Sequence, residues 1–141
     1  MRILSFDTSV NELSIAIFEN EKLVSARTVK PENSNRQETV TRLIPEIESI
    51  FAQNGWTKDS LTHLVVGVGP GSFTGVRIGV VAARTMAQAL NLPLLGINRF
   101  QAILSVFEEP SGLILDGGRN HFFIAAYDPA KIDGIAILEP V

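Results

Sequence analysis

The residues best suited to chemistry form one glycine-rich stretch near the middle of this 141-residue chain. It reads Gly-Val-Gly-Pro-Gly-Ser-Phe-Thr-Gly-Val-Arg-Ile-Gly, between an apolar run and a long small-residue segment. That order predicts a strand, a tight turn and a helix, with Ser72 or Thr74 as the helix cap. Bare N–H groups at a helix start favour an anion, so Gly69, Gly71 and Gly75 could cradle a phosphate. The same glycines could equally form a strand-to-helix corner that binds nothing.

The stretch differs from both common phosphate-binding loops. A Walker loop requires Lys and then Ser or Thr after its last glycine, where this chain has Val76-Arg77. The dinucleotide fingerprint requires a glycine at the position that Thr74 occupies. Glycine content alone therefore favours the structural corner over a phosphate site.

Other catalytic chemistry finds little support in the sequence. Ser72 does not lie in a Gly-x-Ser-x-Gly nucleophile elbow. His63 and His121 have no second histidine at ligand spacing, and the chain has no cysteine. We therefore predict neither a catalytic residue nor a metal site.

Composition narrows the class of protein. Hydrophobic residues make up 45% of the chain and charged residues 19%, which is typical of one globular domain. The net charge of −3 gives no basic footprint for independent nucleic-acid binding. We find neither a secretory h-region nor an apolar run of the roughly 20 residues that span a bilayer. A cytoplasmic protein without membrane contact is the prediction.

The elements that position the glycine stretch follow from periodicity. Alternating apolar runs predict a three-stranded antiparallel meander, and apolar steps of three and four after Glu38 predict a helix ending at Asn54-Gly55. Pro45 lies inside that helix and predicts a kink or a late start. Strands are predicted at 3–6, 13–18, 23–29, 61–68, 94–97, 113–116, 120–127 and 134–138, and further helices at 78–90 and 98–107.

The element order is therefore β-β-β-α-β-α-β-α, followed by the start of a second β-β-β. We predict an α/β domain over residues 1–110, built on a mixed five-stranded sheet with helices packed on it. Residues 111–141 would begin an incomplete second domain, whose strands lack a covering helix. The natural chain is expected to continue, or another element to cover that face.

This element order, with Asp-Thr-Ser after the first strand, resembles the actin-like, sugar-kinase and Hsp70 ATPase fold. More closely, Phe6-Asp7-Thr8-Ser9 and the segment 69–79 are similar to the TsaB (YeaZ) family, whose members usually carry roughly a hundred further residues. Two segments depart from the family pattern. In the first, Thr39-Val40 stands where the family often has a His-Ser or His-Thr pair. His121 and Phe123 replace a Glu and a Tyr.

The resemblance implies a non-catalytic scaffold subunit. Such a subunit supports TsaD, which holds the catalytic metal, in making N6-threonylcarbamoyladenosine at position 37 of tRNA. It implies a TsaE-type ATPase as a further partner, a homodimer through the two helices when alone, and tRNA contact only through the complex. The resemblance implies that the subunit requires no cofactor, and it leaves open that ATP or ADP binds at the interface between subunits. The alternative hypothesis is a small ATPase or sugar-type kinase, for which Asp116 is the only acid at a matching strand end.

The resemblance also implies site residues, each with a simpler interpretation. In ATPases of this fold the acid matching Asp7 helps to hold nucleotide-bound magnesium, but Asp7 could instead accept hydrogen bonds from its own turn. A weak or vestigial phosphate site would comprise Asp7, Thr8, Ser9, Gly69, Gly71, Ser72, Thr74 and Gly75. A partner interface would comprise Arg77, Gly79, Ala82, Ala83, Met86, Leu43 and Ile47. These small and apolar residues could instead pack on the chain's own sheet.

Overall fold

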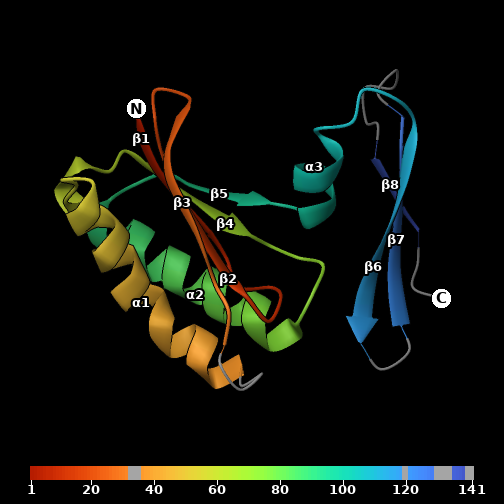
Figure 1. The fold of residues 1–141 in the computed structure, drawn as a ribbon, viewed down its shortest axis with the longest axis horizontal. Coiled ribbons are helices and arrows are strands. Elements are labelled where there is room, and N and C mark those ends of the chain that lie inside the picture. Colours follow the sequence, from red (N-terminus) through yellow and green to blue (C-terminus); the bar gives the residue numbers. More distant parts are fainter. Residues whose placement is uncertain (32–35, 119–120, 129–134, 139–141) are drawn as a thin grey trace.

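The computed structural model describes residues 1–31, 36–118, 121–128 and 135–138. Figure 1 shows two sheets joined through a short helix, with two long helices lying along one side of the larger sheet. Among the described residues, no helix is long and apolar enough to cross a membrane.

The larger sheet has five strands in the order β3-β2-β1-β4-β5. Strands β1 (Arg2–Asp7), β2 (Leu13–Glu19) and β3 (Lys22–Val29) form the antiparallel meander that the sequence predicts. Strands β4 (His63–Gly67) and β5 (Leu94–Ile97) join it in parallel to β1. The predicted mixed sheet is confirmed, and its two parallel crossovers each carry a helix.

Helices α1 (Arg36–Gln53) and α2 (Phe73–Leu90) cover one face of this sheet (Figure 1). The core lies between them, because alternate strand residues such as Leu4 and Leu64 point toward the helices and are fully buried. The helices contribute small and apolar side chains to this core, among them Ile50 and Ala83. A 3₁₀ turn, η1 (Lys58–Ser60), precedes β4.

Ion pairs fix α1 to the edge strand β3. Arg27 on β3 lies 2.6 Å from the Glu46 carboxylate, and it also donates to Ser49 and Gln53 at 3.1 and 2.7 Å. Arg42 reaches the other oxygen of Glu46 at 2.9 Å. The hydrogen bonds from Arg27 and then Arg42 lower the pKa of Glu46 below its usual range, against the opposing effect of burial.

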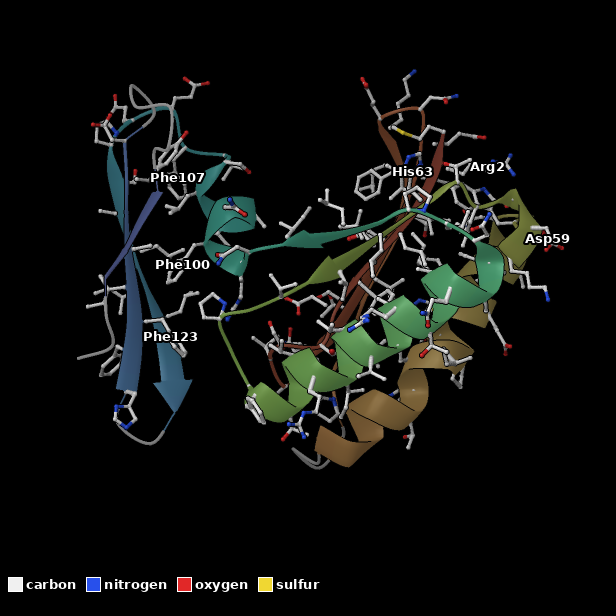
Figure 2. The ribbon with its side chains drawn as sticks, turned by 180° about the vertical axis from the view of Figure 1, so that it is seen from behind. Arg2, Asp59, His63, Phe100, Phe107 and Phe123 are labelled. Carbon is white, nitrogen blue, oxygen red and sulfur yellow. The ribbon has the colours of Figure 1, made fainter. Side chains whose placement is uncertain are left out.

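The smaller sheet has the order β6-β7-β8 and packs on α3 (Arg99–Leu104). Its strands are β6 (Ser111–Gly118), β7 (His121–Tyr127) and β8 (Ile135–Leu138). Figure 2 shows Phe100 and Phe123 directed into the space between α3 and this sheet. A second core forms there from Phe100, Leu104, Leu115 and Ala125, separate from the core of the larger sheet. The boundary at residue 110 remains a prediction.

Two helices differ in extent from their sequence-based predictions. Helix α2 begins at Phe73 rather than Ile78, because Ser72 caps it and the glycine stretch itself supplies its first turns. Helix α3 ends at Leu104 rather than near Phe107, with Ser105 as its C-cap residue. Pro45 lies inside α1, which runs unbroken from Arg36 to Gln53.

Candidate functional site

The glycine stretch forms the corner between β4 and α2. Gly69 has a φ of +84°, a left-handed conformation that glycine adopts without strain. The Ser72 hydroxyl then accepts a hydrogen bond from the Gly75 N–H at 3.3 Å, which caps α2. On the other side of the corner, the Arg99 N–H donates to the Gly69 carbonyl at 2.6 Å, so α3 is tied to the same turn.

The loop between β1 and β2 packs directly against this corner. Thr8 and Ser9 are buried, with 2% and 1% of their surface exposed. The Thr8 hydroxyl donates to the Gly75 carbonyl at 2.7 Å, and the Ser9 carbonyl accepts from the Ser72 N–H at 2.6 Å. The Asp7 carboxylate accepts from both the N–H and the hydroxyl of Ser9, at 2.7 and 3.0 Å. Asp7 therefore accepts hydrogen bonds from its own turn, which is the simpler of the two interpretations that the sequence allows.

The glycines are required by this close approach. A Cβ atom at Gly71 would collide with the Ser9 carbonyl, and one at Gly75 with the Thr8 carbonyl. A Cβ atom at Gly79 would collide with the Thr8 hydroxyl in the same way. Close contact with the chain's own β1–β2 loop thus accounts for these glycines, as expected for a strand-to-helix corner that binds no ligand. Phosphate binding remains a prediction.

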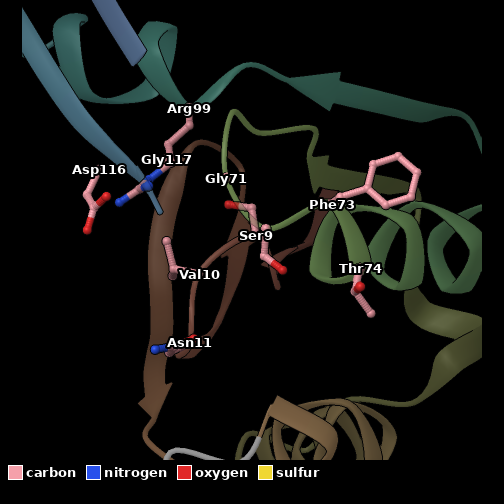
Figure 3. Close-up of a pocket in the computed structure, with 10 residues that line it drawn as sticks. Ser9, Val10, Asn11, Gly71, Phe73, Thr74, Arg99, Asp116 and Gly117 are labelled. Atoms are coloured by element: carbon pink, nitrogen blue, oxygen red, sulfur yellow. The ribbon is translucent and has the colours of Figure 1, made fainter. Parts of the chain in front are cut away.

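A cavity of about 780 Å³ opens in front of the corner. Figure 3 shows it bounded by the Ser9–Asn11 loop, the turn before α2, Arg99 and the end of β6. Four residues of the predicted phosphate site line it, namely Ser9, Gly71, Ser72 and Thr74. The other four, Asp7, Thr8, Gly69 and Gly75, are not among its lining residues.

Arg99 and Asp116 bring opposite charges to the wall of this cavity. Arg99 was absent from the predicted site residues, although it follows a parallel strand at its carboxyl end, where sites of α/β sheets gather. Asp116 comes from the smaller sheet, so the cavity exists only where the two sheets meet. No cluster of metal-ligating side chains occurs in the part of the chain that the structure describes.

The residues predicted to contact a partner have mostly internal positions. Leu43 and Ile47 on α1 and Gly79 and Ala83 on α2 lie in the core of the larger sheet. Ala82 and Met86 are half-buried against the same core. Of the seven, Arg77 alone is exposed. Internal packing accounts for the other six, and partner contact remains a prediction.

The remaining departures from the family pattern fall in different places. The side chains of Thr39 and Val40 lie outside the described residues. His121 is exposed at the start of β7, whereas Phe123 packs against the second core. The Phe at position 123 thus has an apolar packing role that needs no hydroxyl.

Comparison with known proteins identifies the family. The family model "TsaD: tRNA N6-adenosine threonylcarbamoyltransferase" matches residues 15–137. The chain belongs to this family, as a TsaB (YeaZ)-like member. The TsaB protein of Bacillus subtilis is 32% identical over 130 residues, which cover 90% of this chain and 55% of that protein. Escherichia coli TsaB is 37% identical over 98 residues, which cover 70% and 40%.

A solved structure shows the same TsaB-like fold. "YeaZ from Pseudomonas aeruginosa" matches with a TM-score of 0.74 at 21% identity, and covers 99% of this chain and 66% of that one. This likeness confirms the predicted actin-like, ribonuclease H-like fold class. The chain spans about half the length of the curated TsaB relatives that it matches.

Proposed function

We propose that this chain is a non-catalytic scaffold subunit in the synthesis of N6-threonylcarbamoyladenosine at position 37 of tRNA. There it would bind and support a TsaD-type catalytic subunit. Its relatives in Bacillus subtilis and Escherichia coli are named as tRNA threonylcarbamoyladenosine biosynthesis proteins, which supports this pathway.

One observation carries the non-catalytic role. The polar side chains of the Asp7-Thr8-Ser9 motif are engaged within the chain: the Asp7 carboxylate accepts from Ser9, and the Thr8 hydroxyl donates to the Gly75 carbonyl. A catalytic carboxylate or hydroxyl must instead reach the reacting atoms. The motif therefore serves best as a rigid joint that fixes the start of α2, while the partner supplies the chemistry.

The finer parts of the proposal concern partners and cofactors. The chain would form a homodimer when alone, bind a TsaE-type ATPase with TsaD, and meet tRNA only within the complex in the cytoplasm. It would need no cofactor of its own, with ATP or ADP bound at most where the subunits meet.

A reconstitution experiment tests the scaffold role. The full chain is mixed with purified TsaD-type and TsaE-type subunits, and co-elution in gel filtration and transfer of the threonylcarbamoyl group to tRNA are measured. We expect co-elution with the TsaD-type subunit, no transfer by this chain alone, and transfer when all subunits are present. Separate elution, or transfer by the chain alone, would contradict the proposal.

The cavity supports a second candidate, a small ATPase or sugar-type kinase. Its volume of about 780 Å³ suits a small-molecule ligand, and Arg99 and Asp116 offer a phosphate-binding cation and a carboxylate. Calorimetry of the isolated chain with ATP and Mg²⁺ separates the two candidates. Tight magnesium-dependent binding with nucleotide turnover would favour the kinase, and heat changes no larger than dilution would favour the scaffold.

A further inference from the structure

The end of α1 carries the only Asn-Gly pair of the chain, Asn54-Gly55. Glycine has no side chain to hinder its backbone nitrogen from approaching the side-chain amide of the residue before it, so this pair is the asparagine context most prone to deamidation. Every other asparagine precedes a residue with a side chain. Among these, Asn91 directly follows α2 as Asn54 follows α1, but it precedes Leu92, so it offers a natural comparison.

The turn at Asn54-Gly55 is held by hydrogen bonds of unequal strength. The Asn54 side-chain amide donates to the Ile50 carbonyl at 2.7 Å. The Gly55 N–H donates to the Ala52 carbonyl at 3.4 Å, which is longer than an ordinary N–H···O bond. Gly55 has a φ of +66°, as expected for the glycine that ends a helix in a Schellman motif. The nitrogen that would attack the Asn54 amide is therefore weakly held.

The attacking nitrogen is also accessible. Gly55 is exposed, and no neighbouring segment lies within 4 Å of the position that a Cβ atom there would take. Water and hydroxide can therefore reach its N–H. The bonds that must open for the reaction belong to the last turn of a helix, where local opening costs little free energy.

We propose that Asn54 deamidates in the folded chain and that the product loosens the end of α1. The Gly55 nitrogen loses its proton to hydroxide and attacks the carbonyl carbon of the Asn54 side chain. A carbon–nitrogen bond forms and closes a succinimide ring, while the side-chain nitrogen of Asn54 takes a proton from water and leaves as ammonia. Water then opens the ring at either carbonyl, which gives an aspartate or an isoaspartate at position 54. The net reaction is hydrolysis of one amide by water.

Either product loses the contact that the Asn54 side chain makes in α1. A carboxylate cannot donate to the Ile50 carbonyl, and it places a negative charge at a helix C-terminus, where the helix dipole is also negative. The same turn anchors a buried ring, because the Trp56 N–H donates to the Phe51 carbonyl at 2.9 Å and the two rings lie 6.0 Å apart. Loosening should therefore expose Trp56, which is the only tryptophan of the chain.

The first test follows the side-chain amides of the full chain. The folded protein is kept in mildly alkaline buffer, and peptide mapping by mass spectrometry measures conversion at each asparagine. We expect aspartate and isoaspartate to accumulate at position 54 while Asn91 stays intact. Gly55→Ala places a methyl group beside the attacking nitrogen and should slow the conversion at least about tenfold. An intact Asn54, under conditions in which the isolated peptide of residues 50–58 converts, would overturn the inference.

The second test measures the consequence for α1. Asn54→Asp reproduces one product, and Asn91→Asp adds the same charge at the end of α2. Within the described part of the chain, the Asn91 side chain makes no hydrogen bond that this change could remove. We expect the equilibrium constant of unfolding in urea to rise about tenfold for Asn54→Asp and about twofold for Asn91→Asp.

Trp56 fluorescence reads the same loosening directly. Its emission should shift to longer wavelength in the aged chain and in folded Asn54→Asp, and should stay unchanged in Asn91→Asp. Conversion at position 54 with unchanged emission, or equal effects of the two substitutions on unfolding, would overturn the proposed loosening. The inference concerns the chain by itself, so these outcomes leave the proposed function standing.

Discussion

The two faces of α2 use the same eighteen residues for opposite purposes. The inner face is made of Gly79, Ala83 and Ala87, and every one is buried against the sheet or the Thr8 hydroxyl. The outer face carries Phe73 and Val81, both more than half exposed. Glycine and alanine therefore allow α2 to approach the sheet closely on its inner face, whereas Phe73 and Val81 remain in contact with solvent.

The two faces of α2 should also differ in how substitutions affect the free energy of unfolding. Substitutions on the inner side should lower the free energy of unfolding, since packing there leaves no room for adjustment. Substitutions on the outer side should leave folding intact, because those side chains are exposed. Four substitutions compare internal contacts of the chain with the exposed side of α2, from the largest expected change in stability to the smallest.

Gly75→Ala should have the largest effect. Its Cβ would collide with the Thr8 carbonyl, so the β1–β2 loop or the start of α2 must shift, and we expect a loss of about 3 kcal/mol. Urea denaturation measures the free energy of unfolding. Gly112→Ala is the matched control, because a Cβ there meets nothing within 4 Å. Equal stability of the two variants would show that the corner is not tightly packed.

Glu46→Gln should cost about 1–2 kcal/mol at neutral pH, because Arg27 and Arg42 lose their charged acceptor. The pKa of Glu46 is lowered in the folded state, so its stabilisation is complete above the unfolded value of 4.5. That contribution is lost as pH falls through the folded-state pKa. Urea denaturation across the acid range should show the two proteins converging there, and a constant difference would contradict this ion-pair assignment.

Thr8→Val should cost about 1 kcal/mol, since it removes the buried hydrogen bond to the Gly75 carbonyl at nearly constant volume. Thermal unfolding gives the comparison. Thr85→Val is the control, because the Thr85 hydroxyl bonds Val81 within the same helix and is exposed. If both changes have the same effect, the hydroxyl of Thr8 does not hold the two segments together.

Val81→Ser should have the smallest effect on stability, within about 0.5 kcal/mol, because the side chain is exposed. Ala83→Ser, two residues away on the buried face, should cost more, since it places a hydroxyl in the core. Chemical denaturation of both variants gives the difference. A larger loss from the exposed position would remove the distinction between the faces.

Sequence patterns were most reliable where neighbouring residues decide the outcome. Alternation predicted the meander of β1 to β3, and the strand at 94–97 was predicted to the residue. The start of α2 was predicted five residues late, because glycines at the corner also read as turn residues. The helical conformation of Gly75 depends on the Ser72 cap and on the hydrogen bond from Thr8.

The candidate site was predicted only in part, for a related reason. Ser9, Gly71, Ser72 and Thr74 belong to two recognisable motifs, and all four line the cavity. Asp116 was singled out from the sequence only for the kinase alternative, as an acid at a strand end. Arg99 belongs to no motif, so only its position after β5 could have suggested it.

The sequence by itself determined the element types, the element order and the family-like motifs, because these depend on side-chain periodicity and local backbone preference. The tertiary structure decided which glycines face the Thr8–Ser9 loop and which α2 residues remain exposed. The bond between Thr8 and Gly75 joins residues 67 positions apart, and no local pattern records such a contact. Burial depends on what the rest of the fold brings to each face, so the distinction between the buried and the exposed side of α2 appears only in three dimensions.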